Sequence, residues 1–131
     1  MEIDKPEVIA EARAVFDRHE AAIAADDEAA LDAAFWPDPR TVRFGIAETR
    51  HGIEAIRASV RAYAPPITCT ARLTAFGRDV ACTHLACERL GTGLIGRETR
   101  IMARLPGHGW RVVAARVSRL AASDPGAVQG G

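Results

Sequence analysis

The sequence predicts an α+β fold in which three helices, all from the N-terminal side, pack on a curved antiparallel sheet. The chain has 131 residues and a mass of 14.0 kDa, which suits one domain with a single core. Apolar residues recur with helical spacing in the first third, and the remainder is a series of strand-like runs between turn residues. We assign residues 1–120 to this domain and expect the breaker-rich tail, residues 121–131, to be loose.

The first helix is expected to begin close to the N-terminus. Asp4 is a plausible N-cap, and Pro6 falls in the first turn, where its missing N–H breaks no hydrogen bond. Residues at spacings of three and four positions form one apolar helix face, namely Val8, Ala12, Val15, His19 and Ile23. An amphipathic helix is therefore expected to lay this face on the sheet.

A second, short helix is expected over residues 28–35. Asp26 and Asp27 offer its N-cap, and the prolines at positions 37 and 39 end it, because each proline biases its predecessor away from the helix. Strand signals follow at residues 41–45 and 48–51, a pair that predicts a hairpin.

The rest of the chain predicts one more helix and a long sheet. Residues 53–63 show helical spacing and end at two prolines. The four longer strand candidates are residues 67–76, 80–89, 95–105 and 110–120. Turn residues connect them in sequence, which indicates an antiparallel meander.

Composition excludes several classes of protein. Seventeen basic side chains balance seventeen acidic ones, so the domain lacks the excess field needed to bind nucleic acid or an anionic membrane. No apolar run approaches the roughly 18 residues of a membrane span, and the mixed-charge N-terminus does not resemble a secretory signal. Cys69, Cys82 and Cys87 lack a CxxC pair, as expected of reduced thiols in a cytoplasmic protein. The histidines show no metal-ligand spacing, so we predict no metal site.

Two residues stand out as candidates for chemistry. His19 lies on the apolar stripe of the first helix, where it is either a core histidine bonded to a carbonyl or a proton carrier at a pocket. Arg43 shares a strand face with Thr41 and Gly45, opposite Val42. It is either solvated or a guanidinium in the interior, available for a bidentate pair with a substrate carboxylate. We take His19 and Arg43 as the catalytic candidates.

Four further residues are candidates for substrate binding, namely Trp36, Arg97, Arg116 and Ser118. Sixteen of the 17 basic residues are arginines, with Lys5 the only lysine, and the guanidinium group suits planar carboxylates. Arg97 and Arg116 stand at the polar ends of otherwise apolar strand faces, and Ser118 continues the second of them. Such positions fit a cavity mouth, a sheet edge or a dimer interface equally. Trp36 precedes the helix-breaking proline and contacts a ligand or closes the core.

The order of the elements resembles the cone-shaped nuclear transport factor 2-like fold, also called SnoaL-like, which ketosteroid isomerases and polyketide cyclases share. Longer stretches of the sequence are similar to the AtzH-like family over residues 1 to about 120. The stretches are MEIDKPEVIAE, FDRHEAAIAADDEAALDAAFWPDPRTVRFGIAET, HGIEAIRA, TAFGRD and GWRVVAARVS. The most specific part is FW-x-DPRTVRFG followed by E and G.

The resemblance implies a pocket centred on a first-helix tyrosine and on the arginine of an RFG or RYG strand motif. The arginine is Arg43, whereas His19 replaces the tyrosine, because the usual RYE reads Arg-His-Glu here. The family's GRQSQTW reads GRETRIM at residues 96–102, and its closing AAHVS reads AARVS, which places Arg116 where histidine is usual. These departures fall on polar positions, so the resemblance also allows a changed substrate.

The resemblance further implies a role in ureide and triazine-ring breakdown, often beside amidase-signature enzymes, with no metal or organic cofactor. We therefore expect an enzyme, an amidohydrolase or decarboxylating hydrolase, that acts on a small ureido or amide carboxylate. Two alternatives stay open. One is a non-catalytic binding or amidase-partner module, and the other is isomerase or cyclase chemistry of the wider fold. We also expect a homodimer, because the outer sheet face carries apolar residues that a monomer would expose.

Overall fold

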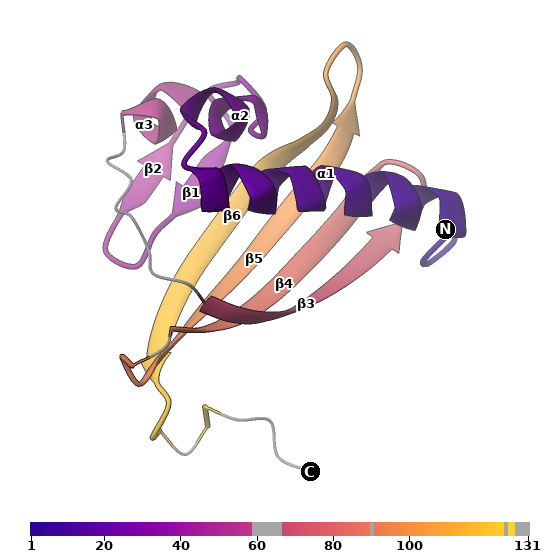
Figure 1. The fold of residues 1–131 in the computed structure, drawn as a ribbon. Helices are drawn as coiled ribbons and strands as arrows, with labels where there is room; N and C mark the ends of the chain where they lie inside the picture. Colours follow the sequence, from indigo (N-terminus) through magenta and orange to yellow (C-terminus); the bar gives the residue numbers. More distant parts are fainter. Residues whose placement is uncertain (59–66, 90, 125, 128–131) are drawn as a thin grey trace.

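A computed structural model describes residues 1–58, 67–89, 91–124, 126 and 127. Helix α1 (Pro6–Ala25) lies across one face of a long, curved sheet. Helices α2 (Glu28–Ala33) and α3 (Ile53–Arg57) gather with the short strands at one end of that sheet (Figure 1). This arrangement is the predicted α+β, nuclear transport factor 2-like fold.

Six strands form the sheet in the order β2-β1-β6-β5-β4-β3. Their bounds are Val42–Phe44 (β1), Thr49–His51 (β2), Ile67–Phe76 (β3), Val80–Arg89 (β4), Leu94–Leu105 (β5) and Gly109–Ala121 (β6). Strands β3 to β6 pair antiparallel with their chain neighbours, so the predicted meander is confirmed. The predicted β1–β2 hairpin is also confirmed, and β1 joins the edge of β6 in parallel.

Helix α1 lays an apolar stripe on the sheet, largely as the spacing predicts. Its buried residues are Val8, Ala12, Phe16, His19 and Ala22. The stripe turns away before Ile23, which is 42% exposed, so the prediction for that residue is wrong. The predicted N-cap is also wrong. Lys5 occupies that position, and the Asp4 carboxylate instead accepts a hydrogen bond of 2.9 Å from the Ala75 amide at the edge of β3.

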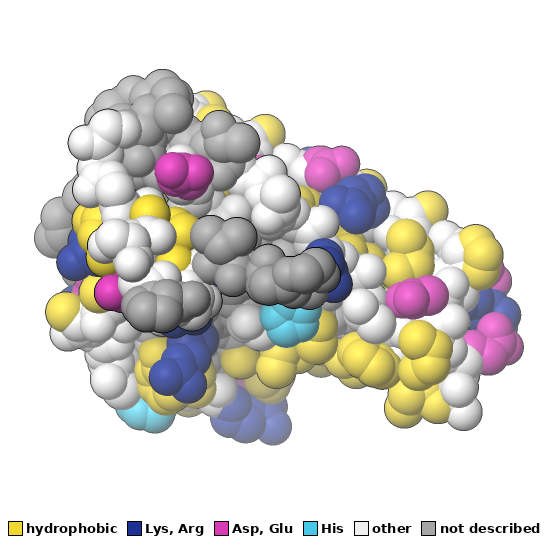
Figure 2. Space-filling view, turned by 90° about the horizontal axis from the view of Figure 1, so that it is seen from below, with side chains coloured by type: hydrophobic (Ala, Val, Ile, Leu, Met, Phe, Trp, Pro, Cys, Tyr) yellow, Lys and Arg dark blue, Asp and Glu magenta, His cyan; other side chains and the backbone are white. Residues whose placement is uncertain are grey.

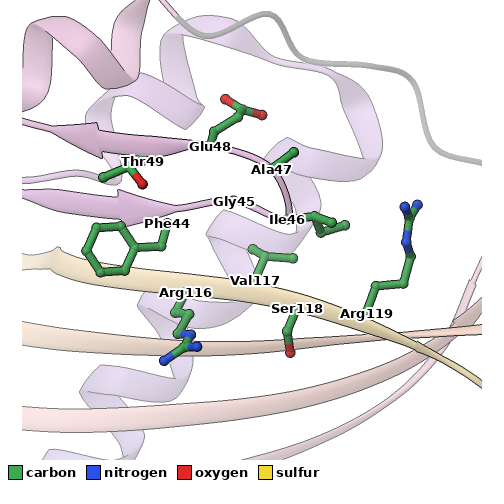
Figure 3. Close-up of a pocket in the computed structure, with 10 residues that line it drawn as sticks. All are labelled: Phe44, Gly45, Ile46, Ala47, Glu48, Thr49, Arg116, Val117, Ser118 and Arg119. Carbon is green, nitrogen blue, oxygen red and sulfur yellow. The ribbon is translucent and has the colours of Figure 1, made fainter.

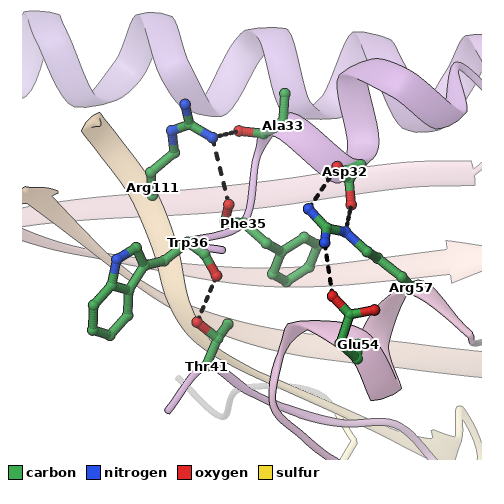
Figure 4. A network of polar contacts seen from close by, with 8 residues as sticks. All are labelled: Asp32, Ala33, Phe35, Trp36, Thr41, Glu54, Arg57 and Arg111. Atoms are coloured by element: carbon green, nitrogen blue, oxygen red, sulfur yellow. Dashed lines mark hydrogen bonds and ion pairs between the residues drawn. The ribbon is translucent and has the colours of Figure 1, made fainter. Parts of the chain in front are cut away.

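The start of α2 agrees with the prediction, because the side chain of Asp27 accepts a hydrogen bond from the Ala30 amide at 3.1 Å. Its other end is held by Arg111 of β6, whose Nη1 donates to the Ala33 carbonyl at 2.5 Å (Figure 4). An arginine thus satisfies a carbonyl that the helix end leaves without an intrahelical partner. Helix α3 begins at Ile53 as predicted, and positions 59–63 of the predicted helix lie outside the described residues.

The strand register determines which side chains lie on each face of the sheet. We call the face that α1 covers the inner face. One row of directly opposed residues crosses it, from β3 to β1: Leu73, Thr83, Arg100, Ala115 and Arg43. A bulge interrupts β6, since Ile101 opposes Ala114 whereas Met102 opposes Val112. Val113 is the extra residue, so Val112 and Ala115 both face inward and join the core with Met102.

The cysteines differ from the expectation. Cys69 and Cys87 are directly opposed on β3 and β4 with their Cα atoms 4.1 Å apart, and they form a disulfide. Cys82 is free and half-buried. The expectation that all three are reduced thiols is therefore wrong for this structure. Sequence spacing could not show the pairing, because the two residues meet only through the strand register.

Candidate functional site

His19 lies between α1 and the inner face of the sheet. Its side chain is buried, and its imidazole meets the Phe35 ring edge-on with 5.8 Å between the ring centroids. Phe35 follows α2 and forms a parallel bridge to Val112 of β6. The helix stripe therefore points His19 into the interior, as the spacing predicts, and an aromatic ring fixes one side of the imidazole.

Arg43 lies half-buried on the same inner face, beside Ala115 of β6. A Cβ atom on Gly45 would lie only 3.3 Å from Arg43 Nη1. Because Gly45 has no side chain, the guanidinium has room to lie along the backbone. Arg50 opposes Arg43 directly on β2, and its Nε donates to Glu48 Oε2 at 3.1 Å. Among the described residues Arg43 has no ion pair of its own, so its charge is available to a ligand.

Arg100, which the sequence analysis did not select, is the most buried charged residue that the structure describes, with 2% of its surface exposed. Its Nη2 forms an ion pair of 2.6 Å with Glu20 Oε1, and its Nε donates to Glu98. The guanidinium also lies over the Phe16 ring, 5.5 Å from the centroid. Burial lowers the pKa of Arg100, but Glu98 and Glu20 outweigh that effect and leave it above its ordinary value, so the group stays cationic.

A signal for this cluster was present in the sequence. Glu98 and Arg100 are two residues apart in a strand and must share a face, and Glu20 follows His19 on the helix that covers that face. The sequence alone left open which face of β5 points inward. The register turns the even-numbered residues toward α1.

Arg97, Arg116 and Ser118 lie on the opposite, outer face. Arg97 opposes Ser118, and Arg116 opposes Thr99, all on the side away from α1. The bulge at Val113 shifts the alternation along β6, because it separates the inward Val112 from the outward residues that follow at even positions. The structure thus brings His19 and Arg43 to one face and places these three residues away from both.

Trp36 closes one end of the sheet. Its amide donates to the Val112 carbonyl at 3.0 Å, and its own carbonyl accepts a 2.7 Å hydrogen bond from the buried Thr41 hydroxyl (Figure 4). The guanidinium carbon of Arg40 lies over the Trp36 ring, 4.6 Å from the ring centroid. These contacts favour a structural role over a ligand contact for Trp36.

Two hollows lined by described residues lie beside the β1–β2 hairpin. One, of about 510 Å³, opens between the hairpin tip and the end of β6 (Figure 3). Figure 3 shows Arg116 and Ser118 pointing to the opposite side of β6 from Arg119. The other, of about 200 Å³, lies on the outer face between Phe44 and Ile101 and is mostly apolar.

The described part of the chain contains no group of three or more His, Cys, Asp or Glu side chains that could hold a metal ion. None of its helices combines the length and hydrophobicity that a membrane crossing requires.

The sequence matches the model of the AtzH-like family over residues 1–123. The chain belongs to the AtzH-like family. This AtzH-like chain is also 38% identical to a cystatin-like fold protein from Burkholderia xenovorans LB400. The similarity covers 92% of this chain and 98% of that one, with a TM-score of 0.83. No curated protein matches the sequence.

A second relative of the AtzH-like chain is a protein with unknown function from the DUF3225 family of Pectobacterium atrosepticum SCRI1043. It is 36% identical over 91% of this chain and 95% of that chain, with a TM-score of 0.85. A putative ketosteroid isomerase from Parabacteroides distasonis ATCC 8503 is 14% identical over 84% of this chain and 88% of that chain, with a TM-score of 0.67. At that identity the likeness shows the fold, which is nuclear transport factor 2-like.

Proposed function

We propose that this protein is a small-molecule enzyme of ureide or nitrogen catabolism, an amidohydrolase or decarboxylating hydrolase. Its substrate would be a small ureido or amide carboxylate, with Arg43 holding the carboxylate and His19 moving the proton. The reaction would need no cofactor, since loss of carbon dioxide from an N-carboxylate requires only modest help.

The observation that carries this proposal is the state of Arg43. It is half-buried on the inner face and makes no ion pair within the described residues, whereas the nearby Arg50 is paired with Glu48. A guanidinium that is partly desolvated and lacks a carboxylate partner in the protein supports binding of a carboxylate from outside, through two parallel hydrogen bonds.

His19 supplies the second function. An imidazole changes its protonation state near neutral pH, so it can protonate a leaving nitrogen or accept a proton from water. Its position on the stripe that faces the sheet puts it on the same side as Arg43. An isomerase of the ketosteroid type would instead need an unpaired carboxylate base. Both acidic residues placed at the described inner centre, Glu20 and Glu98, are paired with Arg100.

The proposal includes the molecule's partners and location. We propose a homodimer through the outer face, an amidase-family protein as a further partner, and a cytoplasmic location. Support for the dimer comes from Phe44 and Ile101, which remain 37% and 38% exposed on the outer face. Figure 2 shows hydrophobic side chains uncovered on the surface with basic side chains between them.

The test is a panel of ureides and carboxylated ureas, assayed for release of ammonia and carbon dioxide. The native chain should turn over at least one compound. His19→Ala should reduce kcat at least about 100-fold, as for the loss of a general acid or base. Arg43→Ala should mainly raise KM. Arg72→Ala, an exposed arginine on the outer face of β3, is the matched control and should change neither constant.

The alternative function makes a different prediction in the same assay. A binding module would release neither product from any compound, yet a ligand would raise the Tm of the native chain and not that of Arg43→Ala. That result would contradict the enzyme proposal and support the non-catalytic one.

A further inference from the structure

Three polar atoms beneath α1 have no hydrogen-bond partner in the part of the chain that the structure describes. They are Arg100 Nη1, Thr83 Oγ1 and Glu20 Oε1, and each atom is shielded from solvent. Arg100 is 2% exposed and Thr83 is 1% exposed. Folded proteins rarely leave buried donors and acceptors unpaired, and each exception calls for an explanation such as local strain, a catalytic role or a bound water or ion.

All three atoms belong to one cluster. Thr83 and Arg100 oppose each other directly on β4 and β5, so their side chains leave neighbouring strands on the inner face. Glu20 Oε1 lies 2.6 Å from Arg100 Nη2, close enough for an ion pair although not aligned as a hydrogen bond. The unpartnered atoms therefore belong to three side chains that lie next to one another under α1.

The charge of this cluster argues against an anion. Glu20 and Glu98 contribute two negative charges and Arg100 one positive charge, so the cluster carries a net charge of −1. A carboxylate would be repelled there. The groups that can still form a hydrogen bond nevertheless include both kinds of partner, since Arg100 Nη1 donates, the ion-paired Glu20 Oε1 can accept one more hydrogen bond and the Thr83 hydroxyl does either.

A ureido or amide group has the complementary pattern. Its carbonyl oxygen accepts from Arg100, and its N–H donates to Glu20 or Thr83. Arg43 stands on the same face two strands from Arg100, about 10 Å between Cα atoms from the spacing of paired strands. Both side chains are long, so a small molecule can place its carboxylate at Arg43 and its neutral end at the cluster.

We infer that Arg100, Thr83 and Glu20 form the recognition site for the neutral ureido or amide group of the ligand. The inference rests on the proposed function for the identity of the ligand. In this arrangement the cluster distinguishes a ureido acid from a plain carboxylate. Arg43 binds only the carboxylate of the ligand.

The test measures binding by calorimetry with three probes. Hydantoate carries a ureido group and a carboxylate, and 4-oxopentanoate has the same shape with both nitrogens replaced by carbon. N-Methylurea carries the ureido group alone. The native chain should bind hydantoate at least about fivefold more tightly than 4-oxopentanoate, because each lost hydrogen bond has a net effect of that size.

Thr83→Val is the informative variant, because it keeps the side-chain shape and removes only the hydroxyl. It should weaken hydantoate binding about fivefold and leave 4-oxopentanoate binding unchanged. Its Tm should equal or exceed the native value, since the lost hydroxyl has no partner in the described protein. Thr74→Val, on the outer face of β3, is the matched control and should change no affinity.

The outcomes separate this inference from the proposed function. If hydantoate binding needs Arg43 but not Thr83, the inference is wrong and the carboxylate site stands. If N-methylurea binds through Thr83 while Arg43→Ala has no effect on hydantoate, the cluster is a ureido site and the role of Arg43 is wrong. Failure of all three probes to bind the native chain overturns both, and leaves the cluster as a site for water only.

Discussion

At the scale of the single residue, buried polar side chains decide the shape of the site. Arg43 and Arg100 are both arginines on the inner face, yet one lacks an ion pair within the described chain and the other holds two carboxylates. The difference depends on which carboxylate lies near each arginine. Glu20 of α1 pairs with Arg100 on β5, whereas Arg43 lies on β1, where the neighbouring Glu48 pairs with Arg50.

Thr41→Val should destabilise the fold without touching either arginine. The Thr41 hydroxyl is fully buried and donates to the Trp36 carbonyl at 2.7 Å. Valine keeps the shape and removes this hydrogen bond, while the Asp38 amide still donates to the same carbonyl at 2.9 Å, so the free energy of unfolding should fall by about 1 kcal/mol. Urea denaturation measures it, with Thr74→Val on the outer face as the control. A change below that of the control would show that water replaces the hydroxyl.

At the scale of the element, the Arg100 cluster is a buried polar attachment of α1 to the sheet. Arg100→Met removes the cation and leaves the carboxylates of Glu20 and Glu98 partly buried without it. Loss of one partner from a buried ion pair typically costs roughly 3 kcal/mol, and we expect denaturation to show a loss of that order.

The rescue of that variant tests the cause. Adding Glu20→Gln and Glu98→Gln to Arg100→Met removes the uncompensated charges, so part of the lost stability should return. A triple variant as unstable as Arg100→Met alone would indicate that packing of the guanidinium on Phe16, rather than charge, holds the helix.

The sequence predicts the elements well because each is encoded locally. The α1 stripe, the Asp27 cap and the strands on either side of Gly77 need only neighbouring residues. Which strand residues point inward is not encoded locally. One extra residue at Val113 reverses the parity along β6, and no periodicity within that strand reveals where the bulge falls. For that reason the sequence could place Arg116 and Ser118 on one strand face but could not say which side of the sheet that face is on.

The Cys69–Cys87 pair gives a prediction at the same scale, because it joins two neighbouring strands. Protein purified without reductant should show one titratable thiol after unfolding in denaturant, and three after reduction. In the folded chain that one thiol, Cys82, should react slowly at neutral pH, since burial raises its pKa and leaves little thiolate. Three thiols without reduction would show that the strands pair with the cysteines unlinked.

At the scale of the whole molecule, the sheet separates two kinds of chemistry. The inner face holds His19, Arg43 and Arg100 under or beside α1, whereas the outer face is apolar around Phe44 and Ile101. The hollow of about 200 Å³ between those two residues is lined mostly by apolar atoms. A domain of this size can therefore devote one face to a ligand and the other to a second copy of itself.

The oligomeric state tests that division. Ile101→Asp puts a charge in the apolar hollow of the outer face, where a dimer would bury it, so the mass from light scattering should fall from dimer to monomer. Ile23→Asp is the matched control, because Ile23 is similarly exposed, at 42%, but stands on α1 away from the sheet. It should leave the mass unchanged. Retention of the dimer by Ile101→Asp, or its loss in Ile23→Asp, would place the contact elsewhere. If hydantoate binding survives in the Ile101→Asp monomer, the inner face binds its ligand without help from the partner.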